Sequence, residues 1–163
     1  MQLALIAFGK LKTPGLEQAA EHYLKNLRPW CRTEVIELKA APIPDKSPAT
    51  RLKIQKIEAD LFLNEVKKLG SNVPYFLLDE KGSARPTREW ADWLKTLEGK
   101  SKGMVVLGLG SSLGFSDELR EKAQGLFSLG PQTLSYELTR VVLIEQLFRA
   151  FSVNRGHPYH NEG

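Results

Sequence analysis

Short apolar runs along the chain alternate with longer segments whose apolar residues recur every three or four positions. The short runs, together with an alternating segment around Val35 and Ile36, predict strands, and the longer periodic segments predict amphipathic helices. The predicted strands are Leu3–Phe8, Glu34–Leu38, Val73–Leu78 and Met104–Leu109. The predicted helices are Pro14–Leu27, Pro48–Leu69, Thr87–Leu97, a short helix capped by Ser116, and Leu138–Val153.

The regular alternation of strands and helices indicates one α/β domain over residues 1–163, with a mainly parallel sheet flanked by helices on both faces. In such sheets ligands bind at the carboxyl ends of the strands. We therefore expect the functional site among three predicted loops that follow strands. These segments are Asp79–Gly82, Gly108–Gly114 and Gly130–Tyr136.

Composition and charge narrow the class of protein only slightly. The chain has 163 residues, of which 42% are hydrophobic and 26% are charged, as is typical of a soluble globular domain. The apolar run at residues 2–8 is too short for a signal peptide or a membrane span, so we expect a cytoplasmic protein. The single cysteine, Cys31, fits a reducing compartment. A net charge of +4 points only weakly to a polyanionic partner.

The segment Gly108–Gly114 places glycines between a predicted strand and a predicted helix, where they let the backbone approach a ligand closely. The spacing differs by one residue from the G-x-G-x-x-G dinucleotide fingerprint, and too little chain follows to complete a doubly wound fold, which disfavours a nicotinamide cofactor. A tight structural turn and a site for a different nucleoside-like cofactor are the other two interpretations.

Arg140 falls in the middle of the apolar stripe of the last predicted helix. A buried cation needs an anion or hydrogen-bond acceptors, because an unpaired buried charge is costly. Arg140 therefore either pairs with a carboxylate such as Glu137 or Asp79, or faces a cofactor, an RNA phosphate or a partner subunit. Glu145 and Arg149 lie on the opposite face of this helix, at the i to i+4 spacing of a helical ion pair.

The tail Arg155–His160 holds two of the three histidines. A terminal histidine is usually a solvated side chain. Here, however, Pro158 restricts the residue before it to an extended backbone and Tyr159 adds an aromatic anchor, so we expect the tail to be held. His160 can act as a general base or hydrogen-bond partner near neutral pH, Tyr159 can stack on a base, and Arg155 can hold a phosphate.

Metal chemistry is not expected from this sequence. The chain has one cysteine and three histidines, and they do not form a cluster with the spacing of metal ligands. No activated-serine motif of the G-x-S-x-G type occurs either.

The segment from Arg140 to His160 resembles the C-terminus of the RlmH family, a group of SPOUT-class methyltransferases of the large ribosomal subunit. The resemblance extends to Leu3–Gly9, Leu77–Gly82 and Phe127–Thr133, and so spans nearly the whole chain. It implies a SPOUT fold with a deep trefoil knot near the C-terminus, and a homodimer with its site at the subunit interface. It also implies methyl transfer from S-adenosyl-L-methionine to N3 of a pseudouridine in the 23S rRNA of the assembled ribosome.

Carried over by position, the resemblance assigns roles to individual residues. Tyr159 and His160 would be the catalytic residues beside the target base, and Arg149 and Arg155 would contact the RNA. The cofactor contacts would be Leu78, Gly110, Ser111, Gly130, Pro131, Gln132, Thr133, Leu134 and Ser135. Because the N3–H of pseudouridine must lose its proton, we expect His160 to take that proton or to orient the base, and Tyr159 to place the ring.

Two positions depart from the family's pattern. Its cofactor loop usually reads G-G-x-x-G, and Ser111 stands at the second glycine. The family also tends to have Pro-His shortly before the helix arginine, where this chain has Ser135-Tyr136. These departures support the alternative interpretation, a non-catalytic RNA- or ribosome-binding protein of the same fold that has lost cofactor binding.

Overall fold

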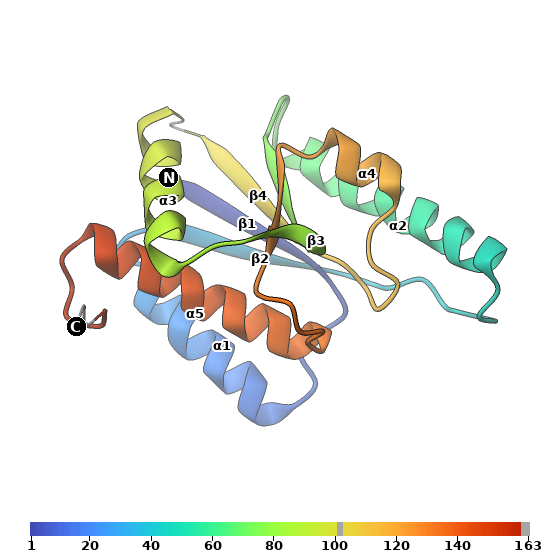
Figure 1. The fold of residues 1–163 in the computed structure, drawn as a ribbon, viewed down its shortest axis with the longest axis horizontal. Coiled ribbons are helices and arrows are strands. Elements are labelled where there is room, and N and C mark those ends of the chain that lie inside the picture. The colour runs from blue at the N-terminus through green and yellow to red at the C-terminus, as the bar shows by residue number, and fades with distance from the viewer. Residues whose placement is uncertain (101–102, 161–163) are drawn as a thin grey trace.

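The computed structural model describes residues 1–100 and 103–160, and Figure 1 shows a central sheet with helices on both faces. The sheet has five strands in the order β2-β1-β4-β3-β5, and all neighbouring strands run parallel. The strands are β1 (Gln2–Phe8), β2 (Arg32–Leu38), β3 (Tyr75–Ala84), β4 (Met104–Leu109) and β5 (Gly125–Ser128). The helices are α1 (Pro14–Leu27), α2 (Pro48–Leu69), α3 (Thr87–Lys100), α4 (Asp117–Lys122) and α5 (Tyr136–Asn154). This arrangement confirms the predicted α/β architecture.

Each face of the sheet carries its own hydrophobic core. The apolar run of β1 is continuous because both faces of this strand are buried. Leu3 and Leu5 point into one core, and Ala4 and Ile6 point into the other. The first core lies against α1, α3 and α5, and the second lies against α2 and α4. The last helix is therefore covered by sheet on one side and by its neighbours α1 and α3 on others.

Helix boundaries follow the local signals in the sequence. The bounds of α1 and α2 are those that the periodicity predicts, and each helix begins at a proline. Ser116 caps α4 as predicted, with its hydroxyl accepting a hydrogen bond from Leu119 N. Ser135 caps α5 in the same way, through Leu138 N.

The prediction that Asp79–Gly82 forms a loop was wrong. Strand β3 continues to Ala84, and its pairing with β5 shifts register between Leu78 and Ser83. Gly82 explains the close approach of the two strands, since a Cβ at this position would lie 2.6 Å from the carbonyl carbon of Phe127. Strand β5, which lies in an apolar segment that the pattern did not resolve as a strand, completes this edge of the sheet.

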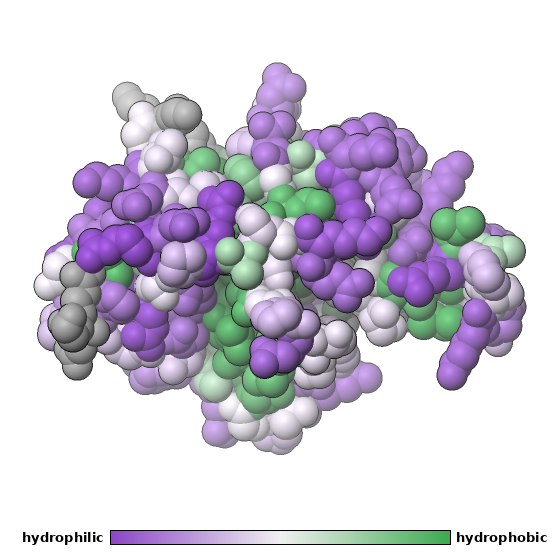
Figure 2. Space-filling model, in the orientation of Figure 1, coloured by the Kyte–Doolittle hydropathy of each residue, from purple (hydrophilic) through white to green (hydrophobic). Residues whose placement is uncertain are grey.

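Most of the surface in Figure 2 is hydrophilic, but apolar residues gather in a band where α5 and α1 lie side by side. Leu138, in the first turns of α5, is 38% exposed. Among the described residues, no helix is long and apolar enough to cross a membrane. The trefoil knot implied by the family resemblance stays a prediction.

Candidate active site

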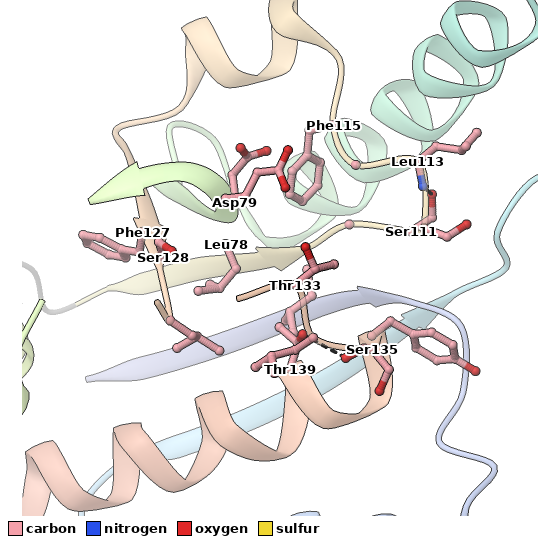
Figure 3. A pocket seen from close by; sticks show the side chains of 18 of the residues that line it. Leu78, Asp79, Ser111, Leu113, Phe115, Phe127, Ser128, Thr133, Ser135 and Thr139 are labelled. Carbon is pink, nitrogen blue, oxygen red and sulfur yellow. Dashed lines mark hydrogen bonds between the residues drawn. The ribbon is translucent and has the colours of Figure 1, made fainter. Parts of the chain in front are cut away.

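A cavity of about 450 Å³ lies at the carboxyl ends of β3, β4 and β5, beside the first turn of α5. We call it the central pocket. Figure 3 shows side chains from separate segments around it, with Leu78 and Asp79 from β3, Ser111 from the loop after β4, and Thr133 and Ser135 from the segment before α5. Its volume is in the range of cavities that hold small ligands and cofactors.

The predicted cofactor residues converge on this pocket. Leu78, Gly110, Ser111, Gly130, Gln132, Thr133, Leu134 and Ser135 all line it, and Pro131 is the single predicted contact that does not. The physical reason is the parallel sheet, which brings the ends of β3, β4 and β5 to one edge although they are far apart in sequence.

Side chains of α2 hold the loop after β4. Ser111 Oγ donates a hydrogen bond of 2.6 Å to Glu58 Oε2. Gln55 Nε2 donates to the carbonyl oxygens of Leu113 and Phe115, at 2.8 and 3.2 Å. Arg51 donates to the same Leu113 oxygen at 3.1 Å. The serine at the family's second glycine is therefore anchored within the fold.

The sequence reasoning missed these three α2 residues. A signal was present, because Arg51, Gln55 and Glu58 recur at i, i+4 and i+7 and so share one face of the helix. Gln55 and Glu58 are buried, at 7% and 4% exposure. Polar residues in register on a buried helix face need partners from another segment, and here the glycine-rich loop supplies them.

The segment between β5 and α5 is fixed by its own polar groups. Ser128 Oγ donates to Gly130 O at 2.8 Å and accepts from Gly130 N at 3.2 Å. Gly130 has a φ of 138°, which favours glycine. Thr139 Oγ1 donates to Ser135 O at 2.9 Å, so the first turn of α5 is tied to the end of this segment.

An ion pair neutralises one wall of the central pocket. Arg120 Nε lies 2.8 Å from Asp79 Oδ2, and Arg120 also contacts Asp117. Burial lowers the pKa of the Arg120 guanidinium, but its hydrogen bonds to Asp79 and Asp117 outweigh burial and raise that pKa overall. The carboxylate of Asp79 therefore has its counter-ion within the fold.

Arg140 is a structural residue, 2% exposed. Its partner is Glu37 of β2, at 2.6 Å, and it also donates to the carbonyl oxygen of Gly9. The expectation of an internal carboxylate partner was right in kind, but Glu137 and Asp79 were the wrong residues. Glu137 instead accepts hydrogen bonds from Lys12 N and Thr13 N, and so ties α5 to the start of α1.

The tail is held against the last turns of α5, as the sequence predicts. The Tyr159 hydroxyl donates to Glu145 Oε1 at 3.0 Å, and its ring packs 4.5 Å from that of Phe148. Arg149 pairs with the same Glu145 oxygen at 2.6 Å and lies over the Tyr159 ring at 4.6 Å. Burial, followed by the hydrogen bonds with Tyr23 and Glu145, raises the pKa of Tyr159 well above its usual value.

Both predicted RNA-binding arginines already have carboxylate partners. Arg149 pairs with Glu145, as the i to i+4 spacing predicts, and Arg155 pairs with Glu98 of α3 at 2.6 Å. These side chains are 31% and 40% exposed, so each remains partly accessible to solvent.

Within one chain, the tail packs along the second half of α5, whereas the central pocket lies beside its first turn. The helix has 19 residues, so it is about 28 Å long at roughly 1.5 Å per residue. Ser135 and Tyr136, at its start, line the pocket, whereas Tyr159 and His160 follow its end. The structure thus brings the predicted cofactor residues together but leaves the predicted catalytic residues apart from them.

Among the residues that the structure describes, no group of three or more His, Cys, Asp or Glu side chains is arranged to hold a metal ion.

The chain resembles known methyltransferases along its whole length. It is 33% identical over 161 residues to ribosomal RNA large subunit methyltransferase H of Lactobacillus delbrueckii subsp. bulgaricus, covering 98% of this chain and 99% of that protein. It is 36% identical over 163 residues to the protein of the same name from Carboxydothermus hydrogenoformans, with the same coverage.

Solved structures share the fold. A probable methyltransferase from Bordetella pertussis superimposes with a TM-score of 0.52 at 16% identity, covering 91% of this chain and 95% of that one. A probable methylase family protein from Haemophilus influenzae gives a TM-score of 0.57 at 13% identity, over 94% of this chain and 66% of that one. The sequence profile of the family described as "Predicted SPOUT methyltransferase" matches residues 1–160. The chain therefore belongs to the SPOUT methyltransferase family.

Proposed function

We propose that this protein uses S-adenosyl-L-methionine to methylate large-subunit ribosomal RNA, at N3 of a pseudouridine in the 23S rRNA of the assembled ribosome. The observation that carries the proposal is the central pocket, which gathers nearly all the predicted cofactor residues at one edge of the sheet. Relatives named as ribosomal RNA large subunit methyltransferase H, 33% and 36% identical over nearly the full chain, support the choice of RNA.

The central pocket fits S-adenosyl-L-methionine in size and in chemistry. Leu78, Leu109 and Phe127 supply apolar wall for an adenine ring, and the hydroxyls of Thr133 and Ser135 supply hydrogen-bonding groups. Gly110 and Gly130 keep the backbone close to the cavity without side chains. The cofactor supplies a methyl group already activated by its sulfonium, so the protein's main task is to align the acceptor.

The tail would complete the site from a second copy of the chain. Tyr159 and His160 do not line the central pocket of their own chain, and Tyr159 packs against the second half of α5, so a homodimer is the simplest way to bring them to the methyl donor. The apolar band over α5 and α1 supports such a contact between copies, and so does the exposure of Leu138 in the first turns of α5.

At the site, His160 would take the N3 proton or hold the base, and Tyr159 would place the ring. Tyr159 suits a positioning role because its hydroxyl is held by Glu145 and its ring by Phe148. Arg149 and Arg155 would approach RNA phosphates with the exposed parts of their side chains. We place this activity in the cytoplasm, with the ribosome.

The decisive experiment adds labelled S-adenosyl-L-methionine to ribosomes that lack the modification and then locates the label. Label at N3 of one pseudouridine in 23S rRNA is the expected result, and label at another base or on a protein would overturn the assigned substrate.

His160→Ala should slow transfer while calorimetry still detects cofactor binding. Absence of any cofactor binding by the unaltered protein would favour the non-catalytic alternative.

Subunit complementation tests the shared site. Thr133→Trp is expected to fill the central pocket, and His160→Ala disables the tail, so each variant alone should be nearly inactive. If the tail acts on the partner's pocket, mixed and reassociated subunits should regain part of the activity, because one of the two sites in each heterodimer is intact. Continued inactivity of the mixture, with heterodimers verified by mass spectrometry, would place tail and pocket of the same chain together instead.

A further inference from the structure

A second cavity, of about 510 Å³, lies at the carboxyl ends of β1 and β2. We call it the lysine pocket, because Lys10, Lys12 and Lys39 line it. It adjoins the central pocket, and the two share Ser111, Ser112 and Tyr136 as lining residues. No role for this cavity follows from the cofactor site or from the tail.

The charges around the lysine pocket favour an anion. Of its two carboxylates, Glu37 is paired with Arg140, and Glu58, which accepts from Ser111 Oγ and Ala41 N, is outnumbered by the three lysines. The three lysines are exposed, and none of them forms an ion pair with another residue of the described part of the chain. The pocket therefore presents uncompensated positive charge at its rim.

Its walls offer apolar surface as well. Phe8 and Leu38 line the cavity from the sheet, and Ile43 lines it from the loop after β2. Ile43 is 45% exposed, which leaves a large apolar side chain partly uncovered beside the lysines. Apolar surface next to cations suits a ligand with a flat ring and a negative charge.

The backbone that carries Lys10 and Lys12 is fixed by contacts that leave both ammonium groups available. The Tyr136 hydroxyl donates to Lys10 O at 3.4 Å, and the Glu137 carboxylate accepts from Lys12 N at 2.9 Å. Gly9 lies so close to the Tyr136 ring that an added Cβ would come within 3.1 Å of it. The loop is thus preorganised around the cavity before any ligand arrives.

We propose that the lysine pocket binds one unpaired nucleotide of the substrate RNA, with its phosphate among the lysines and its base against the apolar wall. This proposal rests on the proposed function. A cavity of this size admits a single base, whereas a duplex cannot enter, and unpaired bases are the usual targets of protein pockets that read RNA. The wall shared with the central pocket puts this nucleotide next to the methylated one.

The test uses the triple variant Lys10→Gln/Lys12→Gln/Lys39→Gln, with ribosomes lacking the modification as the probe. KM for ribosomes should rise on the order of tenfold, and the dependence of log(kcat/KM) on log salt should become shallower by about one to two units, because phosphate contacts are lost. Affinity for S-adenosyl-L-methionine and kcat at saturating ribosomes should stay unchanged. Lys39→Glu should raise KM more than Lys39→Gln, since it adds repulsion.

The matched control is Lys53→Gln/Lys67→Gln/Lys95→Gln, which removes three exposed lysines of α2 and α3 that do not line the pocket. An unchanged KM and salt slope in the triple variant, with methylation intact, would overturn the lysine pocket while the proposed function stands. Equal effects in the control would overturn it too, because bulk charge would then explain the loss.

A dissociated dimer in the triple variant, seen by sedimentation, would assign the pocket to contact between copies and reject the RNA proposal. Failure of the unaltered protein to methylate ribosomes would instead reject the proposed function.

Discussion

Ser111 Oγ and Glu58 Oε2 lie 2.6 Å apart, although 53 positions of the chain separate the two residues. The other oxygen of the same carboxylate accepts from Ala41 N at 3.0 Å. One buried side chain of α2 therefore holds both the loop after β4 and the loop after β2. Since Ser111 lines both cavities, this carboxylate fixes the wall between them.

Ser111→Ala should destabilise the protein and weaken its cofactor site. The variant leaves a buried carboxylate oxygen without its donor, which costs about 1–3 kcal/mol of unfolding free energy. Urea denaturation measures that loss, and calorimetry with S-adenosyl-L-methionine should show a weaker affinity because the loop is less well fixed. Ser112→Ala is the control, since the Ser112 side chain lines the same pockets without a hydrogen bond to another described residue. Equal losses in the two variants would contradict the role of Glu58.

The Arg140–Glu37 pair predicts unequal effects of removing its two members. The Arg140 side chain is 2% exposed and that of Glu37 is 32% exposed. Glu37→Ala strands a buried guanidinium and should lower the unfolding free energy by about 3 kcal/mol, whereas Arg140→Met leaves a carboxylate that water can reach and should cost less. Chemical denaturation of both variants checks the order. A larger loss in Arg140→Met would show that packing of the arginine stem outweighs the burial of its charge.

The stability of the folded protein at alkaline pH should depend on the ionisation of Tyr159, the residue that anchors the tail. Because the pKa of Tyr159 is raised in the folded state, the stabilisation from its proton is complete below the unfolded pKa of about 10 and is lost as pH rises through the folded pKa. Tyr159→Phe removes this titration, so its stability should fall less steeply than that of the unaltered protein above about pH 10. Thermal unfolding across that range makes the comparison. Parallel curves would show that the Glu145 contact does not perturb the phenol.

Glu137 gives the opposite pH dependence. Hydrogen bonds from the backbone N–H groups of Thr13 and Lys12 lower the pKa of this carboxyl. Its stabilisation is therefore present above the unfolded pKa of about 4.3 and is lost as pH falls through the folded pKa. Glu137→Gln should be less stable than the unaltered protein at pH 7, and the gap should close in acid. A difference in stability that persists at low pH would mean that the contact does not depend on the charge of the carboxylate.

The local pattern of the chain was enough to predict most of the secondary structure. Continuous apolar runs identified β1, β3 and β4 because a strand of a parallel sheet is buried on both faces. Helical periodicity, with prolines at the helix starts, set the bounds of α1 and α2. The extension of β3 and the short β5 were missed because they depend on pairing with each other across a register shift, and neither has a periodicity of its own.

The sequence by itself also determined which loops form the central pocket, since parallel strands deliver their carboxyl ends to one edge whatever their order. Only the tertiary structure decided the partners of the charged and polar side chains. Glu58, Glu37 and Glu98 were not among the predicted site residues, yet each meets a partner from a distant segment, Ser111, Arg140 and Arg155 respectively. The identity of each partner cannot be predicted from the local sequence, because it depends on how the layers pack. The same holds for the lysine pocket, which is a property of the assembled layers and not of any one segment.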